Sequence, residues 1–99
     1  MADAWVYMLR CRDGSLYTGW SSDVPRRLAQ HRAGKASRYT ASRLPVELAF
    51  AAPMEDRAAA RREEARIKAL DRAGKLALIG SGPDPPAGLG RARRAVKPA

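Results

Sequence analysis

The strongest constraint on the fold is an Asp-Gly pair, Asp13-Gly14, that lies between two runs of strand-forming residues. "WVYMLRC" precedes the pair and "SLYTGW" follows it almost at once. Aromatic and aliphatic residues on both sides of Asp-Gly are typical of a β-hairpin, because glycine adopts the positive φ that tight turns need. The sequence therefore predicts that two antiparallel strands begin the domain.

The length of the hairpin loop decides whether Tyr7 and Tyr17 share a face of the sheet. A two-residue turn would put the two rings on opposite faces. A three-residue loop that includes Arg12, with Gly14 in the left-handed conformation, would pair Tyr7 with Gly19 instead. The tyrosines would then be diagonal neighbours on one face, about 7–8 Å apart at Cα. Packing is the more common role of tyrosines in a sheet, so a cooperating pair specifically requires the three-residue loop.

The next segment, "SSDVPRRLAQHRAG", is typical of a helix that places one of two adjacent arginines over the sheet. Val24 and Leu28 define its apolar side. Arg27 and His31, spaced i and i+4, both fall within about 60° of Val24 on the helical wheel. Arg26 points to the other side, so we expect it to face solvent. A helix-edge arginine and a surface histidine are the alternative interpretation of the same spacing.

The remaining pattern completes a small α+β domain. A polar, basic connection "KASRYTASRLP" precedes a third strand, "VELAFAA", and a helix over "EDRAAARREEARIKALDRAG" that ends near Gly74. "KLALIG" follows as a short helical segment. The expected order is β-β-α-β-α-α, with a three-stranded antiparallel sheet flanked by helices over residues 1–79. Residues 80–99, rich in Gly and Pro and basic at the end, are expected to form a disordered tail.

The charge balance points to a polyanionic partner. Nineteen Lys and Arg against ten Asp and Glu give a formal net charge of +9. Nucleic acid is the favoured partner ahead of a membrane surface. We expect nucleic-acid contacts from the basic connection and further phosphate contacts from the tail. The residues concerned are Lys35, Arg38, Tyr39 and Arg43 in the connection, and Arg91, Arg93, Arg94 and Lys97 in the tail.

Several classes of protein are disfavoured by the same sequence. The apolar runs are too short to span a bilayer, and the first residues lack the basic and apolar segments of a secretory signal. One cysteine, Cys11, forms no internal disulfide, and one cysteine with one histidine does not fill a zinc site. A cytoplasmic protein with a reduced thiol is expected.

The second helix offers a carboxylate for chemistry. Glu63 and Glu64 lie four and three residues before Ile67, which marks the packed side of the helix. A carboxylate held there suits one hard metal ion whose other ligands are water and phosphate oxygens. Ion pairs with Arg66, Lys68 or Arg61 are the alternative interpretation. The spacing alone does not choose between the two glutamates.

Together these features resemble the GIY-YIG nuclease domain in its compact, single-domain bacterial form, over residues 4–79. "WVY" at 5–7 stands where the family has Gly-Ile-Tyr, and "YTG" at 17–19 stands where it has Tyr-Ile-Gly. The Arg-x-x-x-His of the family follows as Arg27 to His31. "RYT" at 38–40, "PVEL" and "REEARIKAL" also look like the small members.

The resemblance implies cleavage of nucleic-acid phosphodiester bonds with one divalent metal, Mg²⁺ or Mn²⁺. Tyr7 and Tyr17 would form the tyrosine pair, one of them assisting proton removal from the attacking water. Arg27 would stabilise charge on the phosphate, and His31 would support the network or shuttle a proton. Glu64 would bind the metal, with Glu63 as the alternative ligand. A tyrosine is a weak base near neutral pH unless cations lower its pKa, and Arg27 and the metal are expected to do so.

The chain also departs from the family pattern. Trp5 and Val6 replace Gly-Ile, Trp20 replaces a smaller residue, and no asparagine occurs anywhere to match the late Asn of some members. The primary hypothesis is a structure-selective endonuclease acting on DNA in preference to RNA, linked to repair or recombination. The alternatives are a non-catalytic nucleic-acid-binding module that keeps the fold, and a basic protein that serves only as a partner in a repair complex.

Overall fold

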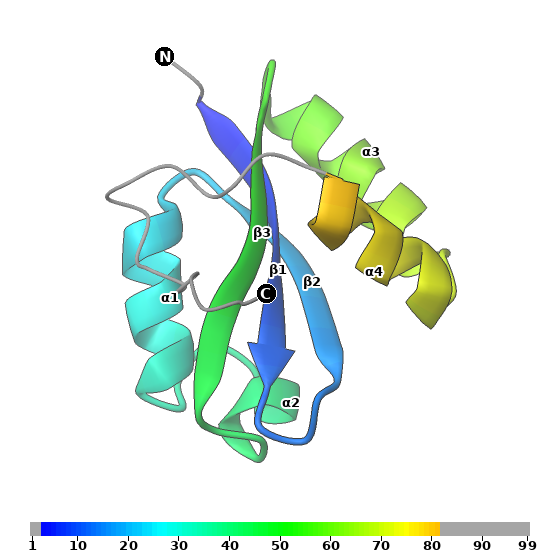
Figure 1. Cartoon of the computed structure of the whole chain (residues 1–99). Helices are drawn as coiled ribbons and strands as arrows, with labels where there is room; N and C mark the ends of the chain where they lie inside the picture. Colours follow the sequence, from blue (N-terminus) through cyan, green and yellow to red (C-terminus); the bar gives the residue numbers. More distant parts are fainter. Residues whose placement is uncertain (1–2, 82–99) are drawn as a thin grey trace.

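A three-stranded antiparallel sheet organises residues 3–81, the part of the chain that the computed structural model describes (Figure 1). Strand β1 (Ala4–Cys11) is central, between β2 (Leu16–Ser21) and β3 (Val46–Met54). The predicted α+β class and the three-stranded antiparallel sheet are thereby confirmed. Most of the predicted tail, with Arg91, Arg93, Arg94 and Lys97, lies outside the described residues.

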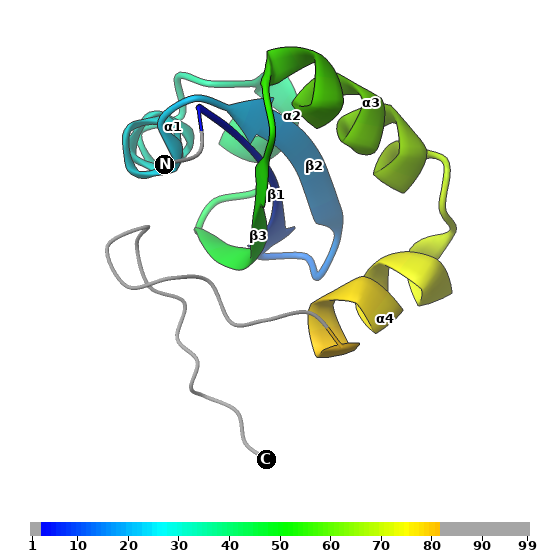
Figure 2. The same ribbon diagram turned by 90° about the horizontal axis from the view of Figure 1, so that it is seen from above.

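Helices cover both faces of this sheet. Helix α1 (Val24–Arg32) lies on one face, and α3 (Arg57–Lys68) and α4 (Arg72–Ser81) lie on the other, as the view from above in Figure 2 shows. Two buried clusters result from this arrangement. One contains Tyr7, Leu9, Cys11, Val24, Leu28, Val46, Leu48 and Ala51, and the other contains Val6, Met8, Phe50 and Ile67. Alternation along β1 sends its side chains to the two clusters in turn, so Tyr7 belongs to the α1 side.

The hairpin has the three-residue loop. Leu9 pairs with Tyr17 and Tyr7 pairs with Gly19, which is the register that places both tyrosines on one face. Gly14 has φ of 85°, and its N–H donates to the carbonyl of Cys11 at 2.9 Å. A left-handed residue at the third loop position is what this loop type requires. The register predicted for a cooperating tyrosine pair is confirmed.

A bulge in β3 keeps the core residues of that strand in phase with β1. Met8 pairs with Phe50, but Leu9 pairs with Leu48, so Ala49 is the extra residue. Leu48 therefore faces the same side as Tyr7 and Leu9, and Phe50 faces the opposite side with Met8. Without the extra residue, one part of the strand would turn its apolar side chains the wrong way.

Short polar side chains begin the helices. Asp23 accepts a hydrogen bond from the Arg26 N–H at 3.1 Å and starts α1, and Asp56 accepts from the Ala59 N–H at 2.8 Å and starts α3. Such caps satisfy amide groups that the first helical turn leaves free. Gly34, with φ of 77°, follows the end of α1.

Two details of the predicted helices are wrong. The basic connection contains a short helix, α2 (Arg38–Ala41), whose N-cap is Ser37. The long second helix is in fact two, because α3 stops at Lys68 and α4 starts at Arg72. Asp71 accepts from the Gly74 N–H at 2.8 Å and thereby opens α4, so Gly74 lies inside a helix instead of ending one.

No helix within residues 3–81 combines the length and the apolar character needed to cross a membrane.

The left-handed conformation of Gly14 gives a stability prediction. A Cβ at this position would meet no atom within 4 Å, so the cost of Gly14→Ala comes from the backbone alone. We expect a loss of about 1 kcal/mol in the free energy of unfolding, measured by urea denaturation. Gly80→Ala is the matched control, since Gly80 also has open space but lies in α4 with no positive φ. It should leave stability unchanged or raise it, and equal effects of the two changes would contradict the strain argument.

Candidate active site

His31 lies between the two tyrosines of the hairpin. Tyr7 Oη and His31 Nε2 are 2.9 Å apart and hydrogen-bonded. The imidazole contacts both phenol rings edge-on, with ring centroids 5.9 Å from Tyr7 and 5.1 Å from Tyr17. Only 1% of the surface of His31 is exposed. The helix spacing that placed His31 over the sheet, and the register that put both tyrosines there, together assemble this cluster.

Gly19 makes room for the phenol of Tyr7. A Cβ added to Gly19 would lie 2.7 Å from Tyr7 Oη and 2.9 Å from its Cζ. Both separations are shorter than any ordinary carbon contact. Glycine in the Tyr-x-Gly segment therefore lets Tyr7 cross directly over β2 toward His31.

The second ring nitrogen of His31 is held by Thr40, which is fully buried in α2. Nδ1 and Thr40 Oγ1 are 2.8 Å apart. Thr40 Oγ1 in turn donates to the carbonyl of Ser37 at 3.4 Å, and Ser37 Oγ lies 2.9 Å away. With its own proton directed to Ser37, the threonine oxygen accepts from Nδ1–H. Nε2 is then the acceptor for the hydroxyl of Tyr7.

Tyr39, the residue before Thr40, supports the second tyrosine. Its ring stacks with that of Tyr17, with centroids 6.0 Å apart and planes 27° apart. The guanidinium carbon of Arg43 lies 3.8 Å from the centre of the Tyr39 ring, and Arg43 Nε donates to Asp13 in the hairpin loop at 3.1 Å. The short helix α2 thus supports both tyrosines. Thr40 bonds to His31, which is the partner of Tyr7, and Tyr39 stacks on Tyr17.

The electrostatics of the cluster favour neutral groups. Burial, together with the positive charge of Arg27, lowers the pKa of His31 to about 4. Burial and the nearby Tyr17 raise the pKa of Tyr7, and Glu64 adds to the rise, while Arg27 acts in the opposite direction. Arg27 lowers the pKa of Tyr7 as expected, but desolvation of the buried phenol outweighs this effect, so the net pKa is raised in the protein alone.

The two adjacent arginines of α1 differ in exposure, as the helical wheel predicts. Arg26 is exposed, whereas Arg27 is half-buried. Arg27 is close enough to Tyr7 and His31 to influence the pKa of both. The guanidinium of Arg27 is therefore the one placed beside the tyrosine–histidine cluster.

The two glutamates of α3 also differ in their partners and in their effect on Tyr7. Glu63 accepts two hydrogen bonds from Arg66, at 2.9 and 2.6 Å, which lower its pKa. Glu64 pairs with Lys68 at 2.9 Å, and it is Glu64 that acts on the pKa of Tyr7. Of the two carboxylates, that of Glu64 is therefore the one that acts electrostatically on Tyr7, and both glutamates also form the helix ion pairs considered as an alternative.

The donor set fits a hard metal ion held by one protein ligand. Within residues 3–81 there is no group of three or more His, Cys, Asp or Glu side chains that could hold a metal. A partly shielded carboxylate, with only 22% of the Glu64 side chain exposed, suits Mg²⁺ or Mn²⁺, which keep water and take phosphate oxygens as other ligands.

The residues expected to contact nucleic acid lie around α2. Lys35 and Arg38 are exposed, and 38% of the surface of Tyr39 is accessible. Arg43 uses Nε and Nη1 within the protein, on Asp13, Ser42 Oγ and the Tyr39 carbonyl. A role for these four residues in nucleic-acid binding stays a prediction.

Sequence reasoning missed the support that α2 gives to the cluster. Asp13 was considered only as a turn residue and Thr40 only as part of the "RYT" segment, although each is a partner of a site residue. The available signal was Ser37 followed by Thr40, since a serine three residues before a polar side chain is common at a helix start. It does not reveal that the threonine reaches a histidine.

A family model described as the GIY-YIG catalytic domain matches residues 3–77. The chain belongs to the GIY-YIG family. Its matched region runs from the start of β1 into α4 and so contains every element of the cluster.

Small proteins of the GIY-YIG family resemble the chain over most of their length. A UPF0213 protein of Natronomonas pharaonis is 45% identical over 78 residues, which cover 79% of this chain and 92% of the relative. A UPF0213 protein of Streptococcus sanguinis is 47% identical over 76 residues, covering 77% and 87%. The solution NMR structure of a UPF0213 protein from Bacillus halodurans superposes with a TM-score of 0.54 at 38% identity, over 83% of this chain and 87% of the other.

The low pKa of His31 gives a pH prediction. The unfolded chain binds a proton near pH 6.5 and the folded one only near 4. Stability from the neutral imidazole is therefore complete above pH 6.5 and decreases as the pH falls toward 4, by about 3 kcal/mol at most. Urea denaturation between pH 7.5 and 4 measures this, with His31→Gln as control, because carboxylates titrate in both proteins. An equal pH dependence in the two proteins would contradict the assignment.

Thr40 gives a second prediction, about the protonation of His31. Thr40→Val keeps the shape but leaves Nδ1–H buried without an acceptor, which should lower the free energy of unfolding by about 1–3 kcal/mol. Thr40→Ser retains the hydroxyl and should keep most of the stability. In ¹⁵N NMR spectra of the imidazole, the Nδ1–H form should dominate in the original and Ser proteins and lose that dominance in the Val protein. An unchanged spectrum in Thr40→Val would show that Thr40 does not fix the tautomer.

Proposed function

We propose that this protein is a metal-dependent GIY-YIG endonuclease that hydrolyses phosphodiester bonds in DNA, selecting DNA structure more than sequence, in repair or recombination. The observation that carries the proposal is the cluster of the buried Tyr7 and His31 with the partly buried Tyr17, on which Arg27 and Glu64 act. The net charge of +9 supports a nucleic-acid substrate.

Arg27 is the residue assigned to the scissile phosphate. A guanidinium presents paired N–H donors to phosphate oxygens, and a half-buried one is less screened by water than an exposed one. Its charge lowers the pKa of His31 in the free protein. A phosphate bound to Arg27 would offset this repulsion, so substrate binding would make His31 a better proton acceptor.

Tyr7 and His31 are assigned to proton transfer. The raised pKa of Tyr7 means that its hydroxyl keeps its proton at neutral pH and donates it to Nε2. Tyr7 therefore accepts a proton from water only while it passes its own to His31. Thr40, bonded to Nδ1, holds the ring in the form that can receive that proton. Tyr17, on the other edge of His31, is assigned to orienting the water or the phosphate.

Glu64 is assigned to the divalent metal, Mg²⁺ or Mn²⁺. Members of the family that are nucleases generally use divalent metals, and a bound ion would neutralise charge on the phosphate. Lys68, at 2.9 Å, holds the Glu64 carboxylate in the absence of other cations. Lys68 must therefore yield part of this contact when an ion is bound.

The surface around α2 is assigned to the DNA beyond the scissile bond, through Lys35, Arg38, Tyr39 and Arg43. We also propose a cytoplasmic location, which agrees with the buried, unpaired Cys11. A protein partner in a repair complex is compatible with a chain that has one catalytic domain.

Matched substitutions test this function. Flap, fork, single-stranded and linear DNA are incubated with the protein and Mg²⁺ or Mn²⁺, and cutting is measured on gels. Arg27→Ala and Glu64→Gln should each lower the cleavage rate by about 10²-fold or more, since each removes charge stabilisation. Arg26→Ala and Glu63→Gln change the same residue types one position earlier and should keep most of the activity.

The outcomes separate the candidate functions. Metal-dependent cutting that Arg27→Ala and Glu64→Gln abolish supports the enzyme. Salt-sensitive DNA binding without any cutting supports the non-catalytic module. Cutting retained by both variants points to a contaminating nuclease and overturns the site assignment.

A further inference from the structure

Four charged residues follow one side of α3 around the glutamate assigned to the metal. Arg57, Arg61, Glu64 and Lys68 are spaced by four, three and four residues. At about 100° per residue, they fall within roughly 60° of one another. We call these four residues the Glu64 flank.

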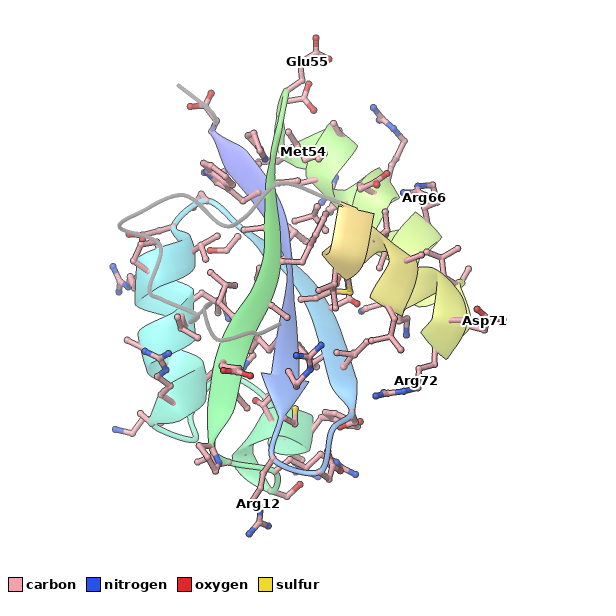
Figure 3. All side chains as sticks on the ribbon, viewed as in Figure 1. Arg12, Met54, Glu55, Arg66, Asp71 and Arg72 are labelled. Atoms are coloured by element: carbon pink, nitrogen blue, oxygen red, sulfur yellow. The ribbon has the colours of Figure 1, made fainter. Side chains whose placement is uncertain are left out.

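Another side of α3, around Glu63, can be compared with the Glu64 flank. Ala60 and Ile67 are fully buried and mark the side of α3 that packs on the sheet. Glu64 and Glu63 fall about 50° to either side of that direction. Arg62 and Arg66 lie beyond Glu63, and Figure 3 shows Arg66 on the outer side of α3. We call Arg62, Glu63 and Arg66 the Glu63 flank.

Within residues 3–81, the Glu64 flank carries two unpaired arginines and the Glu63 flank carries one. On the Glu63 flank, Arg66 is bound to Glu63 by two hydrogen bonds, and Arg62 is exposed without a hydrogen bond or ion pair to any residue of 3–81. On the Glu64 flank, Lys68 is paired with Glu64, but Arg57 and Arg61 are exposed. Neither of these arginines forms a hydrogen bond or an ion pair with any residue in the described range 3–81. Two like charges at i and i+4 repel each other, and an anion between them would remove that repulsion.

The Glu64 flank contains the carboxylate assigned to the metal. α3 packs against β1 and β2, the strands that carry Tyr7 and Tyr17. Arg61 lies three residues before Glu64, which places the two side chains on neighbouring turns of the same side of α3. An anion held by Arg57 and Arg61 would therefore lie beside the carboxylate assigned to the metal.

We propose that the Glu64 flank binds the sugar-phosphate backbone of the DNA strand that is cut, with Arg57 and Arg61 contacting phosphates next to the scissile one. The proposal rests on the proposed function and names a surface on α3 in addition to the surface around α2. From Arg57 to Lys68 the helix rises about 16 Å. One strand of duplex DNA carries a phosphate about every 3.4 Å along the duplex axis, so the flank would span about five nucleotides if α3 lay parallel to that axis.

Adjacent arginines on the two flanks test the proposal. Fluorescence anisotropy of a fluorescein-labelled forked DNA, at 0.1 M salt and with EDTA so that nothing is cut, gives the dissociation constant. Arg61→Glu should weaken binding by about eightfold or more, the value expected for one lost phosphate contact at this salt concentration. Arg62→Glu makes the same charge change one residue away, at another exposed arginine, and should weaken binding less than threefold.

The salt dependence provides a second readout. In Arg57→Ala/Arg61→Ala, the slope of log affinity against log salt should become shallower by about 1.8, because two phosphate contacts are lost. Circular dichroism establishes that each variant is folded.

The DNA-binding measurements test the flank separately from the proposed nuclease activity. Selective weakening by Arg61→Glu supports the Glu64 flank whether or not the protein cuts DNA. Equal weakening by Arg61→Glu and Arg62→Glu, or no effect of either, overturns the flank and leaves the active-site assignment standing. Absence of DNA binding by the unsubstituted protein overturns the flank and the DNA substrate together.

Discussion

The cluster depends on one buried histidine that makes two hydrogen bonds to two different parts of the chain. His31 joins Tyr7 of β1 through Nε2 and Thr40 of α2 through Nδ1, at 2.9 and 2.8 Å. A buried imidazole with either bond missing would leave a polar nitrogen desolvated and unpaired. The positions of β1, α1 and α2 are thereby coupled, since any shift of one breaks a bond to the others. The rest of the candidate site is arranged around this constraint.

Burial of polar groups gives the cluster its chemical character. Removing Tyr7 and His31 from water favours the neutral form of each, so the free protein holds a protonated phenol against a neutral imidazole. Neither group carries a charge in the resting state of the free protein. Charged groups act on the pair from its surroundings, positive at Arg27 and negative at Glu64, and the proposed function assigns the phosphate and the cation to these two residues.

Local chemistry explains which features could be predicted from the sequence. The Asp13-Gly14 pair predicted a hairpin with two possible registers, between which the structure decides, and helical spacing separated Arg27 from Arg26, because both depend on short-range geometry. The helix α2 was missed, because four residues leave no periodicity to detect. The lowering effect of Arg27 on the pKa of Tyr7 was predicted, but the larger effect of burial was not, since burial depends on how distant elements pack around the phenol. Helical spacing alone left Glu63 and Glu64 open as the metal ligand, and the family resemblance favoured Glu64, which in the structure is the glutamate that acts on the pKa of Tyr7.

The place of β2 in the sheet has a consequence for the shape of the substrate. Within residues 3–81, β2 pairs with β1 alone and forms an edge of the sheet. Tyr17 is therefore at a rim of the sheet, and a long chain that reaches it there can continue in both directions. If the chain acts on nucleic acid as proposed, a polymer would not need a free terminus to reach Tyr17, which is compatible with the proposed cleavage within a strand.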